Sequence, residues 1–135
     1  MIQELMIIDQ AGIALFYHNF IDDDSLEDEQ TLASYFDIIC RFTKREFKES
    51  LKFLALDSFI FFFYTHKSQY HLVLKCVNEE IDKSKLEEVS ETIIESFLKK
   101  HEEDLKDFNG EISHFKSFSK DIMHILDSKF ESLYA

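Results

Sequence analysis

Histidine is the residue type in this chain with the most obvious potential for metal or acid-base chemistry. Of the six histidines, only His66 and His71 are expected to meet, across a turn centred on Ser68 and Gln69. A zinc site needs a third ligand close to such a pair, and the neighbouring sequence offers none. We therefore expect two exposed histidines at strand ends and no bound metal.

A cluster of carboxylates lies between residues 22 and 29 and resembles a calcium-binding loop in composition. It lacks the spacing of an EF-hand loop and its central glycine. A solvated acidic loop is the simpler interpretation. The residues are Asp22, Asp23, Asp24, Glu27, Asp28 and Glu29.

Catalytic and cofactor motifs are not evident elsewhere. Gly12 and Gly110 are the only glycines, so the chain has no glycine-rich phosphate loop. Serine, histidine and aspartate are common, but no nucleophile elbow selects three of them. Cys40 and Cys76 lie in apolar segments without CxxC spacing, which is typical of buried reduced thiols. We predict no catalytic site, no cofactor and no enzymatic activity.

The composition indicates one domain of 135 residues with 45% hydrophobic residues. A formal net charge of −12 would repel nucleic acid and anionic membrane surfaces. The N-terminal segment lacks a basic region and a cleavage site, and no apolar run reaches the roughly 20 residues that span a bilayer. These features predict a cytoplasmic protein, without direct membrane insertion or nucleic-acid binding.

The first half of the chain predicts a β-hairpin followed by a helix. Residues 2–8 and 13–20 have the pattern of strands, joined by a turn with Asp9 at its start and Gly12 where positive φ is often required. Ser25 and Asp28 have the spacing of a capping box, and the helix is expected to run to about Lys48.

The second half predicts three strands and two helices. Residues 50–56, 59–65 and 70–77 suit an antiparallel meander, and the run 59–65 has the pattern of a strand buried on both faces, which requires helices on both sides of the sheet. A helix begins at Asp82 or Ser84 and keeps an apolar side as far as Leu105. Asn109 and Gly110 form a stop signal, and a last amphipathic helix extends to Leu133.

The first helix has a wider apolar arc than one contact with a sheet requires. Its expected core stripe consists of Leu32, Phe36, Ile39 and Phe47. A second apolar group lies beside this stripe and consists of Tyr35, Ile38 and Phe42. Either the helix is deeply nested in the fold, or the second group is a partner surface. In the second case the strand segment Leu15, Phe16 and Tyr17 would be an edge available for pairing.

A basic run follows on the same helix, and at helical spacing it lies on the arc opposite the expected core stripe. It consists of Arg41, Lys44, Arg45 and Lys48. A solvated face that complements the helix dipole accounts for it, and an acidic partner could use it secondarily.

The predicted order β-β-α-β-β-β-α-α resembles that of the longin domain. The hairpin at 5–16, the strand at 59–64 and the helix junction at 107–118 carry the likeness, which covers essentially the whole chain, 1–135. The resemblance implies an α+β, profilin-like fold with a five-stranded antiparallel sheet, one helix on one face and two on the other. The related roadblock module usually begins with an additional helix, for which this chain has no room.

Longin domains are interaction modules of vesicle trafficking and GTPase regulation, and stand-alone versions occur in archaea. The resemblance therefore implies a non-catalytic module that dimerises with itself or with a second longin- or roadblock-like protein, or binds a small GTPase, and that is recruited to membranes only by its partners. The interface it implies is the one described above: Leu15, Phe16, Tyr17, Tyr35, Ile38 and Phe42. The alternative is a small-ligand sensor of the PAS or GAF kind, with an apolar ligand held among the phenylalanines.

Overall fold

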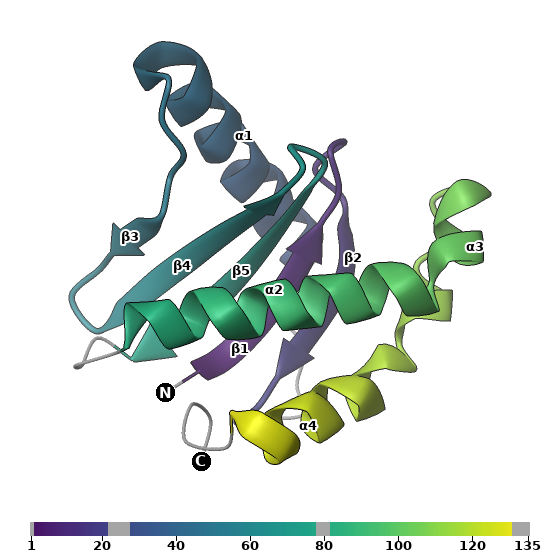
Figure 1. Cartoon of the computed structure of the whole chain (residues 1–135). Coiled ribbons are helices and arrows are strands. Elements are labelled where there is room, and N and C mark those ends of the chain that lie inside the picture. The colour runs from purple at the N-terminus through teal and green to yellow at the C-terminus, as the bar shows by residue number, and fades with distance from the viewer. Residues whose placement is uncertain (1, 22–27, 78–81, 131–135) are drawn as a thin grey trace.

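The computed structural model describes residues 2–21, 28–77 and 82–130. A five-stranded antiparallel sheet lies between α1 on one face and α2 and α4 on the other (Figure 1). The elements are β1 (Ile2–Ile8), β2 (Ala14–Asn19), α1 (Glu29–Phe47), β3 (Phe53–Ala55), β4 (Phe59–His66), β5 (Tyr70–Val77), α2 (Lys83–Lys100), α3 (Glu102–Lys106), the 3-10 turn η1 (Ser113–Phe115) and α4 (Phe118–Lys129). The α+β class and the layer arrangement expected from the longin resemblance are confirmed.

The strands lie in the order β2-β1-β5-β4-β3, so β2 and β3 form the edges of the sheet. The meander β3-β4-β5 is confirmed, because each strand pairs with the next in antiparallel register. β1 and β5 are the most buried strands, whereas β4 is fully buried only at Phe62 and Phe63. The prediction that the whole 59–65 run is buried on both faces is therefore wrong at its ends, because residues 59–61 and 64–65 are only partly buried.

The first hairpin turns where the sequence predicts. The Asp9 carboxylate accepts hydrogen bonds from the main-chain N–H groups of Ala11 and Ile13, at 3.0 and 2.9 Å. Gly12 has a φ of +80° and is buried. A Cβ at this position would lie 3.3 Å from Asp37 Oδ2, so glycine also permits the close approach of α1.

The face covered by α2 and α4 contains the larger hydrophobic core. The rings of Phe97 and Phe118 lie 5.1 Å apart, Phe97 and Phe115 5.3 Å, and Phe16 and Phe118 5.4 Å, measured between centroids. These are contact distances between aromatic rings. The phenylalanines of this layer fill the space with their own side chains, which counts against the PAS- or GAF-like sensor.

The smaller core, under α1, is centred differently from the expected stripe. The buried residues of the helix are Ala33, Phe36, Asp37 and Cys40. Phe47, which we expected in the core, is 65% exposed. At 100° per residue Phe47 lies on the buried side of the helix, but it is the last residue of α1 and follows the last buried residue, Cys40, by about two turns. Its exposure therefore comes from its place at the end of the helix.

Several predicted boundaries also differ. α1 begins at Glu29 with Asp28 as its N-cap, so Asp28 is not at the third position of a capping box, and Ser25 lies outside the described residues. β3 has only three residues, because its pairing with β4 is limited to Phe53–Ala55. The predicted helix to Leu105 is interrupted at His101, whose ring packs 5.1 Å from both Phe97 and Phe115. Leu133 lies outside the described residues.

Among the described residues, no helix has the length and apolar character needed to cross a membrane.

Candidate functional site

The outer side of α1 carries an apolar stripe, which we call the α1 stripe and define as Tyr35, Ile38 and Phe42. Their exposed fractions are 54%, 59% and 49%. At 100° per residue the stripe lies on the side of the helix opposite the buried residues, so packing on the sheet does not account for it. The stripe is an exposed apolar surface of the kind that marks interfaces.

The N-terminal turn of α1 lies against the free edge of the sheet. The Gln30 side chain accepts a hydrogen bond from the Ala14 N–H through Oε1 and donates one to the Ala14 carbonyl through Nε2, both at 2.9 Å. This amide satisfies both main-chain groups of Ala14 as a neighbouring strand would. Gln30 thereby links the helix that carries the α1 stripe to edge strand β2.

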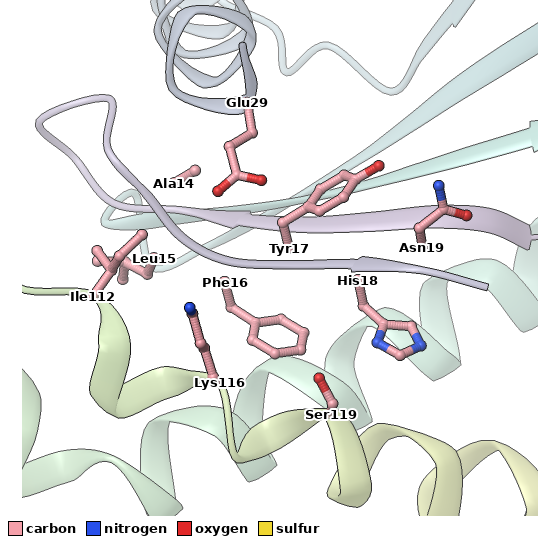
Figure 2. Close-up of a pocket in the computed structure, with 10 residues that line it drawn as sticks. All are labelled: Ala14, Leu15, Phe16, Tyr17, His18, Asn19, Glu29, Ile112, Lys116 and Ser119. Atoms are coloured by element: carbon pink, nitrogen blue, oxygen red, sulfur yellow. The ribbon is translucent and has the colours of Figure 1, made fainter. Parts of the chain in front are cut away.

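A groove of about 500 Å³ follows β2 beyond Ala14. Figure 2 shows Glu29 on one side of the strand and Lys116, Ser119 and Ile112 on the other. Burial raises the pKa of the Glu29 carboxyl, and the Lys116 charge partly opposes that rise. The groove is therefore bounded by groups of opposite charge, with the strand edge between them.

The three predicted interface residues on β2 differ in their exposure. Leu15 and Phe16 are buried in the core under α2 and α4, so their side chains are not on the surface. The Phe20 N–H donates a hydrogen bond to the Gln3 carbonyl on β1. Main-chain groups alternate in direction along a strand, and Tyr17 is an odd number of residues from Phe20. The N–H and carbonyl of Tyr17 are therefore directed away from β1. At Tyr17 the edge of the sheet therefore presents the main chain of β2.

Tyr17 also borders a second, smaller groove, of about 200 Å³, between α1 and the sheet. Met6, Phe61 and Val73 are among the sheet residues that line it, and Leu32 and Phe36 line it from α1. At one end Lys75 forms an ion pair of 2.8 Å with Glu4, and the Tyr17 hydroxyl donates to the same carboxylate. Burial and this carboxylate raise the pKa of Tyr17, so its hydroxyl stays protonated.

A buried polar network between α1 and β5 was not predicted. Asp37 is 1% exposed; its Oδ2 lies 2.7 Å from Arg41 Nη2, and its Oδ1 lies 3.3 Å from His71 Nε2 without hydrogen-bond geometry. The Thr65 hydroxyl lies 3.0 Å from His71 Nδ1. Because a carboxylate only accepts, these contacts favour the neutral tautomer with its proton on Nε2 and Nδ1 accepting from Thr65. Burial lowers the pKa of His71, which agrees with a neutral ring.

The histidine prediction is consequently wrong in its pairing and its exposure. His71 is opposite Thr65 and His66 is opposite Tyr70, so the two histidines are not partners. His71 is buried rather than at an exposed strand end. The signal that could have revealed the network is the i, i+4 pair of Asp37 and Arg41, with its aspartate among apolar residues.

The remaining predicted sites give little chemistry. Within residues 2–21, 28–77 and 82–130, no three histidine, cysteine or acidic side chains are grouped so that they could hold a metal ion. Most of the acidic cluster, residues 22–27, lies outside the described residues. Cys40 and Cys76 are buried free thiols, and burial raises the pKa of Cys76 to about 11.

Comparisons with known proteins bear on the fold. No protein-family model and no curated protein sequence matches the chain. Among solved structures, the chain is similar to the gliding protein MglB from Thermus thermophilus, with 15% identity and a TM-score of 0.47, over 55% of this chain and 59% of that chain.

Two other MglB structures align better. Myxococcus xanthus MglB has 13% identity and a TM-score of 0.51, covering 67% of this chain and 85% of that one. An MglB with a tetrameric arrangement has 16% identity and a TM-score of 0.53, covering 64% and 68%. The chain therefore has the longin/roadblock-like fold of these proteins.

Proposed function

We propose that this chain, as a single domain over residues 1–135, is a non-catalytic interaction module that forms a dimer through the α1 stripe and the edge of β2. The observation that carries the proposal is the exposure of Tyr35, Ile38 and Phe42 on the side of α1 opposite the core, next to an edge strand that Gln30 attaches to the same helix.

We propose a second copy of this chain as the partner at this surface. Two chains of net charge −12 repel each other, and close approach requires a place where that charge is offset. At the α1 stripe that place is Arg45, whose guanidinium lies 5.8 Å from the centre of the Phe42 ring. A two-fold contact would use the same surface on both chains. The tetrameric arrangement of one MglB is an example of self-assembly by a protein with this fold.

We propose a small GTPase as the further partner, in a membrane-trafficking or GTPase-regulatory assembly in the cytoplasm, with membranes reached only through partners. The support is the resemblance to longin domains in the hairpin, the interior strand and the helix junction. The test is size-exclusion chromatography with purified small GTPases loaded with GDP or with a non-hydrolysable GTP analogue. A complex that depends on the bound nucleotide is expected.

The dimer is tested by light scattering across a range of protein concentrations. The wild type should have the mass of a dimer, and Ile38→Asp should be a monomer with an unchanged circular dichroism spectrum, because a carboxylate cannot be buried unpaired in an apolar contact.

Leu56→Asp is the matched control. Leu56 is 50% exposed at the turn between β3 and β4, away from the α1 stripe, so this variant should remain a dimer. A monomeric wild type, or equal effects of the two substitutions, would contradict the proposed interface.

A further inference from the structure

A pocket of about 290 Å³ lies on the flank of α1 that faces the turn between β4 and β5. It is separate from the α1 stripe and from the groove along β2. The pocket is lined from α1, from the segment before β3 and from the turn that joins β4 to β5. The lining residues are Gln10, Asp37, Cys40, Arg41, Lys44, Ser50, Leu51, Thr65, Lys67, Ser68 and His71.

The charge of this pocket is opposite in sign to that of the chain. Its wall has three cationic side chains, Arg41, Lys44 and Lys67, and one anionic side chain, Asp37, in a protein of net charge −12. Asp37 is already paired with Arg41 at 2.7 Å, and His71 beside it is neutral. Among the described residues, neither Lys44 nor Lys67 forms an ion pair with a carboxylate. The pocket therefore has an excess of positive charge.

The pocket also combines these charges with hydrogen-bond donors. The hydroxyls of Ser50 and Ser68 lie in its wall, and Arg41 keeps further N–H donors beyond the one on Asp37. Several N–H and O–H donors in one pocket suit a tetrahedral oxyanion, which can accept many hydrogen bonds. The volume is close to the lower end of small-ligand sites, roughly 300 Å³, which fits a phosphate with a small organic group.

The backbone around the pocket is held in an uncommon conformation. The described non-glycine residues with positive φ are Lys48, Lys67 and Ser68, at 60°, 51° and 59°. Lys67 and Ser68 line the pocket, and Lys48 precedes the segment that supplies Ser50. Glycine would adopt positive φ at less cost. Here the turn has a lysine and a serine, which are side chains that can bind an anion.

We propose that this pocket binds the phosphate group of a small phosphorylated molecule, with Lys44, Lys67 and Arg41 as the cationic contacts and Ser50 and Ser68 as hydroxyl donors. Thr65 and His71 also line the pocket. This site is independent of the proposed dimer, because none of these side chains belongs to the α1 stripe.

The test is an NMR titration of the labelled full chain with inorganic phosphate, with ionic strength held constant by sodium chloride. Saturable shifts are expected at the amides of residues 41–44 and 67–68. Lys44→Ala/Lys67→Ala should weaken binding by about tenfold or more, because two charge-assisted contacts are lost. Both lysines are exposed, so the fold should persist.

The matched control is Lys85→Ala/Lys99→Ala, which removes the same charge from exposed positions on α2, on the other face of the sheet. It should leave the phosphate affinity within about twofold of the wild type, because distant exposed charges are screened by salt. Shifts that do not saturate, or equal losses in the two double variants, would show only non-specific charge screening and would overturn the proposal.

Discussion

Gln30 and Ala14 form a two-way pair in which one side-chain amide both donates to and accepts from the main chain of the other residue, at 2.9 Å in each direction. The pair joins the first turn of α1 to the start of edge strand β2. It protects one position of an exposed edge by substituting for a neighbouring strand. The positions beyond it on β2 border the open groove.

Replacing Gln30 by Ala should lower the free energy of unfolding by about 1 kcal/mol, because two hydrogen bonds of a partly exposed amide are lost. Chemical denaturation would measure the loss. Thr31→Ala changes the neighbouring exposed residue and should have little effect. Equal stabilities of the two variants would mean that the amide does not hold the helix to the strand.

Acidification should destabilise the protein through His71. Its pKa in the folded state is lowered from 6.5, chiefly by burial; Asp37 works in the opposite direction and Arg41 adds to the lowering. The unfolded chain therefore takes up this proton at a higher pH than the folded chain does. Stability should fall as the pH drops below about 6.5, until the folded state is also protonated.

The pH dependence can be assigned by substitution. His71→Gln should flatten the stability curve in the window below pH 6.5, whereas His124→Gln, at an exposed position on α4, should leave its slope as it is in the wild type. Denaturant titrations at a series of pH values supply the curves. A wild-type slope in His71→Gln would refute the assignment.

The difference in burial between Phe97 and Phe47 predicts that their substitutions change stability by very different amounts. Phe97 is fully buried between α2 and α4, and Phe97→Ala should cost about 3–5 kcal/mol of folding free energy. Phe47→Ala should change stability by no more than about 0.5 kcal/mol, as is usual for an exposed position. Urea denaturation would compare them, and a loss at Phe47 as large as that at Phe97 would restore the core stripe predicted from the sequence.

Both thiols should be unreactive in the folded protein. Burial raises the pKa of Cys40 to about 12 and that of Cys76 to about 11, so neither forms much thiolate near neutral pH. An aromatic disulfide reagent should react slowly with the native chain and with both cysteines after denaturation. Rapid reaction of one equivalent in the native state would contradict this burial.

The element order could be predicted because it follows from local patterns, whereas the placement of one helix on one face and two on the other came from the resemblance to longin domains. Each of three patterns identifies one segment from neighbouring residues alone. They are the alternation and turn residues of the first hairpin, the apolar 59–65 run and the Asn109-Gly110 stop. The exposure of Tyr35, Ile38 and Phe42 was one of two interpretations of a wide apolar arc, and only the position of the helix on the sheet distinguishes them.

The polar network could not be predicted, because it depends on contacts between segments far apart in sequence. Asp37 is an unfavourable core residue until the fold brings Arg41 and His71 to it. A periodicity argument treats that aspartate as part of the wet side. It also places Phe47 in the core, because periodicity does not show that the last two turns of α1 lie beyond its buried residues. The burial of Leu15 and Phe16 likewise follows from the position of α4, which the strand pattern does not contain.

The central claim, that two copies meet through the α1 stripe, is tested most directly by isotope-filtered NMR on an equal mixture of labelled and unlabelled chains. At a concentration where light scattering gives the dimer mass, the Ile38 methyl groups should show intermolecular contacts with aromatic protons of Tyr35 or Phe42 of the other copy. A dimer whose intermolecular contacts all lie elsewhere, with none at Ile38, would contradict the account.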